Sequence, residues 1–193
     1  MKREINPKQK ALLDTAKDLF WKFGYKKVSI EEICRKANVS KMTFYKFFPN
    51  KLQIAKEILL VLYETASKNF EEMMHSDITP KEKIHRIILM KMENTNQISK
   101  EFLDDMYFDL NSDLHKFVME QTDKIWQSTF QTFREAQAKG WFREDFKPEF
   151  VIAASFKMME LMNDEKVMSL YGNAQDFIKE ITNFVAFGIT PEQ

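Results

Sequence analysis

The side chains with the clearest chemistry lie in the segment 41–48, Lys-Met-Thr-Phe-Tyr-Lys-Phe-Phe. On a helix, where each residue turns by about 100°, its phenylalanines share one side and its polar residues project from the other. Lysine neutralises phosphate or donates to guanine, hydroxyl groups reach phosphates or base edges, and methionine can contact a thymine methyl group. The projecting residues therefore favour binding to a DNA groove. They are Lys41, Met42, Thr43, Tyr45 and Lys46.

The residues around this segment predict that it is the second helix of a helix-turn-helix. Ser29 and Glu32 form a capping-box pattern that begins a preceding short helix, and Asn38 suits the left-handed conformation that ends it. Ser40 then caps the segment 41–48 after a tight turn. Two short helices joined in this way weaken the alternative that the segment is only a solvated basic face.

A longer helix is predicted in front of this pair. Asn6 can cap it, Pro7 suits its first position, and Gly24 follows as a left-handed stop. Apolar and small residues at spacings of three and four give it one buried stripe. The stripe comprises Leu12, Thr15, Ala16, Leu19, Phe20 and Phe23.

The formal net charge of zero hides an uneven distribution. Residues 1–56 hold 14 Lys and Arg against 5 Asp and Glu, a net charge of +9, and residues 57–193 hold 15 against 24, a net charge of −9. This asymmetry indicates an amino-terminal part that meets a polyanion and a remainder that does not, although a chance partition of a neutral surface is the alternative.

The rest of the chain also has helical spacing, and with 4 glycines and 5 prolines a β-sandwich or barrel is disfavoured. We expect an all-α fold of about nine helices, with a three-helix DNA-binding domain over 1–50 and a larger helical domain over 51–193. The helices predicted after residue 50 run from 50 towards 74, from 80, from 100, from 113 to 140, from 148 to 168, and from 174 to 187.

Two short motifs raise the alternative of a di-iron enzyme. Glu72 and His75, and again Glu82 and His85, have the Glu-x-x-His spacing of di-iron helical bundles. The two pairs flank one predicted loop, and Glu82 also completes a capping box. The single cysteine, Cys34, has no metal-ligand cluster around it, and neither a phosphate loop nor a nucleophile elbow is present. We therefore expect that the protein is not an enzyme and that it holds no cofactor or metal. A di-iron metalloenzyme is the alternative.

The stretch 11–59 resembles the amino-terminal module of TetR-type transcriptional regulators. The matching residues are Phe23-Gly24-Tyr25, Val28-Ser29-Ile30 and above all the run 39–51, VSKMTFYKFFPNK. The resemblance implies that Ser29 lies near a phosphate and that Lys51 holds the DNA backbone beyond the groove. Lys41, Thr43, Tyr45 and Lys46 would lie in or beside the major groove.

Two positions depart from the pattern of that family. Asn38 stands where a glycine is usual, and Met42 where a smaller or more polar residue is common. Asparagine tolerates the left-handed conformation, but Met42 obscures the preferred base sequence. The DNA-binding set expected from the residues and the resemblance is Ser29, Lys41, Met42, Thr43, Tyr45, Lys46 and Lys51.

The resemblance also implies a homodimer formed through the last two long helices. Packing within one chain is the equally weighted alternative for each apolar position on those helices. The positions that suit a dimer seam are Phe150, Val151, Ala154, Met158, Leu161, Phe177, Ile181 and Phe184.

A small, largely apolar effector is a further implication of the resemblance. Ten of the 12 methionines follow Met42, and thioethers beside aromatic rings make adaptable cavities. Asp104, Asp105 and Asp109 could favour a cationic ligand, but a solvated acidic face explains them better. The expected effector contacts are Phe102, Met106, Tyr107, Trp126, Phe130, Met158 and Met162.

These expectations combine into a cytoplasmic, ligand-responsive regulator, a repressor that binds a near-palindromic operator as a homodimer and is released by its effector. A regulator controlled by a protein partner is an open alternative. Residues 1–4 carry no apolar signal core, and the run 58–63 is far shorter than the roughly 20 residues that a membrane span requires.

Overall fold

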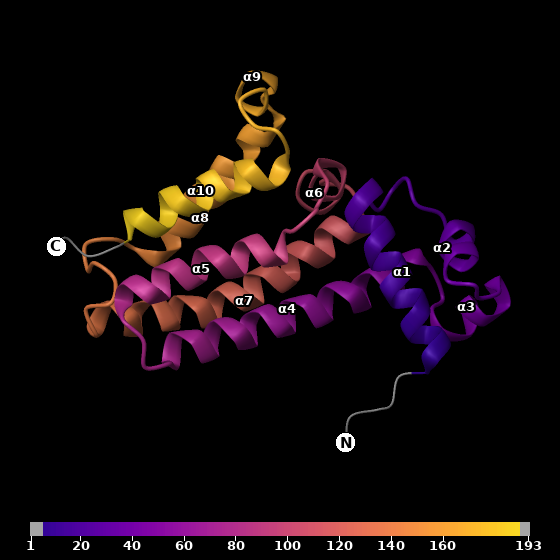
Figure 1. The fold of residues 1–193 in the computed structure, drawn as a ribbon, viewed down its shortest axis with the longest axis horizontal. Coiled ribbons are helices and arrows are strands. Elements are labelled where there is room, and N and C mark those ends of the chain that lie inside the picture. The colour runs from indigo at the N-terminus through magenta and orange to yellow at the C-terminus, as the bar shows by residue number, and fades with distance from the viewer. Residues whose placement is uncertain (1–5, 190–193) are drawn as a thin grey trace. The chain divides into compact units, whose positions relative to one another are not determined.

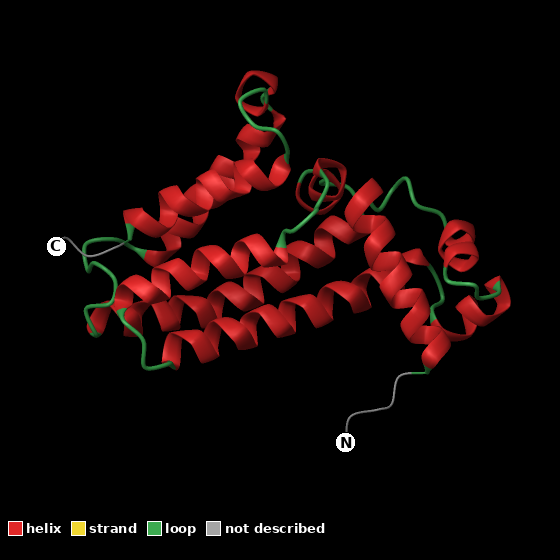
Figure 2. Ribbon diagram, in the orientation of Figure 1, coloured by secondary structure: helices red, strands yellow, loops and turns green. Residues whose placement is uncertain are grey.

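The computed structural model describes residues 6–189, and within that range every regular element is a helix (Figure 2). Ten α-helices and one 3-10 helix form in these residues, which confirms the predicted all-α fold. Residues 1–4, on which part of the expected localisation rested, lie outside the described range. The elements are α1 Pro7–Phe23, α2 Ile30–Lys36, α3 Lys41–Phe47, α4 Lys51–His75, α5 Pro80–Asn94, α6 Lys100–Tyr107, α7 Asp113–Ala138, α8 Pro148–Glu160, η1 Leu161–Asn163, α9 Glu165–Met168 and α10 Ala174–Gly188 (Figure 1).

The chain divides into two compact units. The first unit comprises Met1–Tyr63 and Gln97–Gln121, and the second comprises Glu64–Asn96 and Thr122–Gln193. The long helices α4 and α7 contribute to both units, so this division differs from the functional boundary expected after residue 50. That boundary concerns function and stays a prediction.

The first unit is built on the apolar stripe of α1 and the inner face of α3. Leu12, Ala16, Leu19 and Phe20 are at most 3% exposed, as the spacing predicts. Phe23 differs, because it ends the helix and is 39% exposed. The rings of Phe44 on α3 and of Phe48, which directly follows α3, are fully buried, and their centres lie 5.6 Å apart.

Helix ends in the structure follow the capping residues in the sequence. The side chains of Asn6, Ser29, Ser40, Thr79 and Ser99 each accept a hydrogen bond from a backbone N–H in the first turn of the helix that follows. Each bond satisfies a donor that the helix itself leaves unpaired. The predicted left-handed turn after α2 is also confirmed, since φ of Asn38 is 53°.

The second unit packs α10 against α5 and α8. Its core contains a lysine, Lys83, whose side chain is fully buried. The Lys83 ammonium donates to the carbonyl oxygens of Met73, Met74 and Ser76 at 3.3, 2.8 and 2.7 Å, and so satisfies the carboxyl end of α4. The same Nζ atom lies 4.2 Å from the centre of the Trp141 ring.

The predicted continuous helix from 148 to 168 is interrupted. Helix α8 ends at Glu160, the 3-10 turn η1 follows, and Asp164 then caps the four-residue helix α9. The Asp164 carboxylate accepts hydrogen bonds from the N–H groups of Lys166 and Val167, which fixes a new helix start. Through residues 6–189, no helix combines the length and apolar character that crossing a membrane requires.

Candidate DNA-binding surface and effector region

Helix α3 presents a polar and basic face because its opposite side is anchored in the core. Ser40 Oγ accepts a 3.1 Å hydrogen bond from the N–H of Thr43, which fixes the start of the helix. The buried rings of Phe44 and Phe48 then set its rotation about its own axis. As a result Met42 is 70% exposed and Tyr45 is 55% exposed, and Lys46 is also exposed.

The first turn of α3 is linked to α2 by an ion pair. Lys41 Nζ is paired with a carboxylate oxygen of Glu31, and both side chains are more than half exposed. The hydrogen bond from Lys41 lowers the pKa of Glu31, and the same bond raises the pKa of Lys41. Lys41 therefore carries its full positive charge at neutral pH, although part of that charge is balanced by Glu31.

The serine and threonine hydroxyl groups of the expected set both form hydrogen bonds at helix starts. Ser29 Oγ accepts a 3.1 Å hydrogen bond from the N–H of Glu32 at the start of α2. Thr43 Oγ1 lies 2.9 Å from Ser40 Oγ, so these two hydroxyl groups share a hydrogen bond. Ser29 is exposed at a helix amino terminus, where the backbone N–H groups attract anions.

Lys51 has partners that the sequence did not indicate. Its ammonium donates hydrogen bonds to the carbonyl oxygens of Tyr25, Lys26 and Val28 at 2.8, 3.3 and 2.9 Å. It also lies 4.3 Å from the centre of the Tyr25 ring. Burial lowers the pKa of Lys51, and the nearby charge of Asp105 partly offsets this effect. The phosphate contact expected for Lys51 stays a prediction, and its ammonium binds the loop between α1 and α2.

The acidic residues on α6 and just after it are not simply a solvated face. Asp105 is only 7% exposed, and its Oδ2 accepts a 3.0 Å hydrogen bond from the N–H of Lys26. Asp109 Oδ2 pairs with Lys26 Nζ at 2.8 Å, and Glu101 pairs with Lys27 at 3.3 Å. Sequence reasoning missed these contacts, because a cluster of acids carries no signal of its partners.

The seven expected effector contacts are divided between the two units. Phe102, Met106 and Tyr107 belong to the first unit, and the other four belong to the second unit. Phe102 packs in the core, with its ring centre 4.9 Å from that of Trp21 on α1.

In the second unit, the ring centres of Trp126 and Phe130 lie 6.5 Å apart and the rings are stacked. Met162 is buried and Met158 is partly buried. Within residues 6–189, the buried indole N–H of Trp126 has no hydrogen-bond acceptor.

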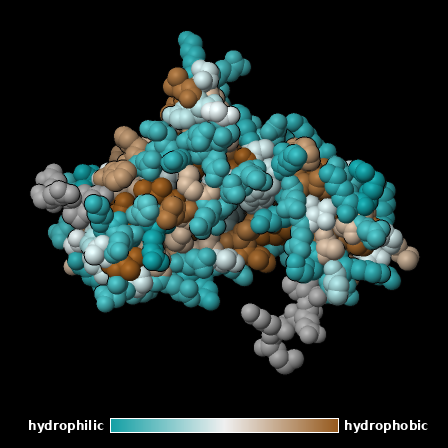
Figure 3. Space-filling view, in the orientation of Figure 1, coloured by the Kyte–Doolittle hydropathy of each residue, from teal (hydrophilic) through white to brown (hydrophobic). Residues whose placement is uncertain are grey.

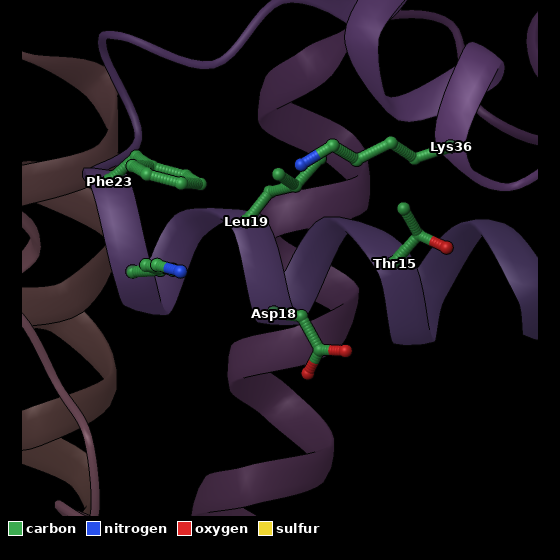
Figure 4. Close-up of a pocket in the computed structure, with 6 residues that line it drawn as sticks. Thr15, Asp18, Leu19, Phe23 and Lys36 are labelled. Carbon is green, nitrogen blue, oxygen red and sulfur yellow. The ribbon is translucent and has the colours of Figure 1, made fainter.

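A shallow hollow of about 320 Å³ lies on the first unit between α1 and the end of α2 (Figure 4). Around it, Lys22 and Lys36 place their ammonium groups 5.3 and 5.5 Å from the centre of the Phe23 ring. None of the expected effector contacts lines this hollow. Its lining residues are Thr15, Asp18, Leu19, Lys22, Phe23 and Lys36.

The residues of the di-iron alternative are arranged differently from a metal site. Glu82 closes the capping box of α5, since its Oε2 accepts hydrogen bonds from Thr79 N and Thr79 Oγ1 at 2.9 and 2.8 Å. His75 and His85 are both exposed. Across residues 6–189, no three or more His, Cys, Asp or Glu side chains are grouped so that they could hold a metal ion.

Comparison with known proteins agrees with this geometry. Residues 12–58 match the family described as "Bacterial regulatory proteins, tetR family". The uncharacterized HTH-type transcriptional regulator YhgD of Bacillus subtilis (strain 168) is 30% identical over 94 residues, which cover 48% of this chain and 49% of YhgD. The match thus spans about half the length of that relative. A second regulator of the same organism, YdgC, is 22% identical over 199 residues, covering 100% of this chain and 97% of YdgC.

Solved structures are similar over almost the whole chain. The fatty acid degradation regulator FadR from Bacillus halodurans aligns with a TM-score of 0.71 at 16% identity, covering 96% of this chain and 98% of FadR. The regulatory protein TetR from Rhodobacter sphaeroides aligns with a TM-score of 0.69 at 18% identity, covering 96% and 100%. At these identities the likeness establishes a shared fold.

Proposed function

This chain belongs to the TetR family of transcriptional regulators, and on that premise we propose that it is a ligand-responsive repressor that binds a near-palindromic operator as a homodimer. The observation that carries the proposal is the exposed face of α3, where Met42, Tyr45 and Lys46 project from a helix anchored by buried phenylalanines. Two such helices in a dimer would enter successive major grooves about one DNA turn apart.

We assign direct DNA contacts by the chemistry of each side chain. Tyr45 and Lys46 would reach base edges or phosphates, and Met42 would contact an apolar base edge. Lys41 and Thr43 would lie beside the groove at the start of α3. Ser29 would bring the amino terminus of α2 to a phosphate.

The dimer is proposed to form through α8 and α10. Phe150 on α8 and Phe184 and Phe187 on α10 are 67 to 71% exposed, which is unusual for phenylalanine. Figure 3 shows apolar side chains beside hydrophilic ones at the surface where α10 lies in Figure 1. Phe177, which sequence spacing also placed in the seam, is only 2% exposed, and packs against Tyr171 of the same chain.

The effector is proposed to be small and largely apolar, and to act in the cytoplasm. The second unit supports this assignment best, because the stacked rings of Trp126 and Phe130 share that unit with the flexible side chains of Met158 and Met162. In the first unit, Met106 and Tyr107 are the better candidates, since Phe102 is occupied by its packing against α1. Release requires that the effector bind the DNA-free conformation more tightly than the DNA-competent one.

The proposal is tested by replacing both Tyr45 and Lys46 with alanine and measuring binding to duplex DNA by fluorescence anisotropy. The double variant is expected to lose sequence-specific binding while its circular dichroism spectrum and its oligomeric state stay those of the wild type. Lys124→Ala, which removes one exposed charge from α7 in the second unit, is the matched control and should bind normally. Tight, specific binding by the double variant would refute the assignment of α3 to the groove.

A further inference from the structure

We propose that Lys51 and Asp105 are positioning residues of the DNA-binding surface. Together they hold the loop between α1 and α2 through hydrogen bonds to its backbone groups, and we call this pair of contacts the brace. This inference rests on the proposed function, since it concerns what holds the DNA-binding helices in place. It assigns Lys51 a role other than a phosphate contact. It also extends the DNA-binding machinery to α6, outside the residues 12–58 that match the family.

The braced loop, residues 24–29, leads directly into the DNA-binding helices. It begins at Gly24, which follows α1, and ends at Ser29, the N-cap of α2. Helix α2 is in turn tied to α3 by the ion pair between Glu31 and Lys41. A displacement of the loop would therefore move the start of α2 and, through it, the groove-facing helix.

Lys51 holds the carbonyl side of this loop. An ammonium group has three N–H donors, and those of Lys51 are directed at the carbonyl oxygens of Tyr25, Lys26 and Val28 at 2.8 to 3.3 Å. The Tyr25 ring covers the same ammonium at 4.3 Å. With all three donors used and its side chain partly buried, Lys51 would have to break this set of bonds to reach a phosphate.

Asp105 holds the amide side of the same loop. Its Oδ2 accepts a 3.0 Å hydrogen bond from the N–H of Lys26, the residue whose carbonyl oxygen binds Lys51. Asp105 Oδ1 also lies 4.0 Å from Lys26 Nζ, and its carboxylate acts electrostatically on Lys51. One residue of the loop is thus held through its amide by α6 and through its carbonyl by α4.

Gly24 allows α6 to approach the loop between α1 and α2 closely. Its φ of +87° lies in a region that side chains disfavour. A Cβ atom at this position would lie 2.9 Å from Asp105 Oδ2 and 3.0 Å from Glu101 Cβ. The glycine thus serves the contact with Asp105 as well as the end of α1.

The test compares Lys51→Met, Lys51→Arg, Asp105→Ala and Asp105→Asn on one operator duplex, with affinity measured over a range of salt concentrations. A brace predicts that Lys51→Met and Asp105→Ala each weaken binding by about tenfold or more, the effect of losing hydrogen bonds to a charged group. The dependence of log affinity on log salt should keep its wild-type slope, because no phosphate contact is removed.

The conservative variants separate the two roles of Lys51. Arginine keeps the charge but has a planar fork in place of three diverging donors. If the hydrogen bonds to the three carbonyl oxygens are what matters, Lys51→Arg should bind no more tightly than Lys51→Met. Asp105→Asn keeps an oxygen acceptor for the Lys26 amide and should retain more affinity than Asp105→Ala. A salt slope reduced by about one unit in Lys51→Met, with rescue by Lys51→Arg, would overturn the brace in favour of a phosphate contact.

Two further measurements separate the effect of the brace from a loss of stability and from a failure of the proposed function. Ile84→Ala, a truncation in the core of the second unit, lowers stability without touching the loop and should leave the affinity of the folded protein unchanged. Hydrogen exchange of the amides in residues 25–30 should accelerate in Lys51→Met and Asp105→Ala without any DNA present. If the wild type binds no specific DNA, the proposed function fails, and unchanged exchange in these variants refutes the brace by itself.

Discussion

The ammonium of Lys51 lies 4.3 Å from the centre of the Tyr25 ring and donates a 2.8 Å hydrogen bond to the Tyr25 carbonyl oxygen. A lysine at the start of α4 resembles a phosphate-binding residue when only its sequence motif is considered. In the folded chain its ammonium donates hydrogen bonds to three backbone carbonyl oxygens of a neighbouring loop. On the inference above, this lysine positions the DNA-binding helices, and the phosphate contact that the motif implies stays a prediction.

Gly24→Ala should be among the most damaging small substitutions in the first unit. The variant forces a side chain into a left-handed backbone conformation and towards Asp105, at a cost of roughly 1–3 kcal/mol in the free energy of unfolding. Chemical denaturation monitored by circular dichroism measures this loss. Gly188→Ala is the control, since its added Cβ meets nothing within 4 Å and it should be neutral or slightly stabilising. Equal effects of the two variants would contradict the close approach of α6.

Much of the first unit could be predicted from the sequence because its signals are local. N-caps, the left-handed Asn38 and the inward phenylalanines of α3 depend on neighbours within a few positions. The brace could not be predicted, since Asp105 lies 79 positions from the Lys26 amide that it binds. The only residue in the sequence that hinted at this contact was Gly24, and its position after the first helix was already explained by its role as a helix stop.

The second unit was less predictable for a related reason. The helical periodicity of 148–168 continues across the point where Asp164 offers the backbone an alternative helix start, so the interruption after Glu160 did not stand out. Likewise, an apolar residue on α10 can face its own chain or a second one, and spacing alone cannot separate Phe177 from Phe184. Only the exposed fraction of the side chain distinguishes them, at 2% for Phe177 and 71% for Phe184.

Lys83→Met should destabilise the second unit strongly. The variant leaves the carbonyl oxygens of Met73, Met74 and Ser76 without their shared donor, and we expect a loss of roughly 2–4 kcal/mol in the free energy of unfolding. Lys81→Met, on the exposed side of the same helix, is the matched control and should change stability little. Urea denaturation of both variants gives the comparison. A loss no larger in Lys83→Met than in the control would show that the buried ammonium is dispensable.

Asp109→Asn should reduce stability at neutral pH but not in acid. The hydrogen bond from Lys26 lowers the pKa of Asp109 below its ordinary value of 3.8. For a carboxylate with a lowered folded pKa, the stabilisation is complete above the unfolded value and is lost as the pH falls through the folded value. The Tm of the wild type should therefore exceed that of Asp109→Asn at pH 7, and the gap should close below pH 3.8. Asp123→Asn is the exposed control, and a gap independent of pH would contradict the ion pair.

Phe184→Asp should shift the protein from dimer to monomer. The ring is 71% exposed on α10, so an aspartate there costs the single chain little but places a charge in the proposed seam. Size-exclusion chromatography with light scattering measures the mass of each species. Leu170→Asp, at a residue that is 77% exposed outside α8 and α10, is the matched control and should remain dimeric. A dimeric Phe184→Asp would place the interface elsewhere.

Selection of bound duplexes from a random pool at two salt concentrations shows whether α3 of this chain reads a specific DNA sequence. We expect a near-palindrome whose half-sites lie about one helical turn apart and whose binding survives at the higher salt concentration. Recovery of no motif, or of binding that disappears with salt and leaves no sequence preference, would contradict it.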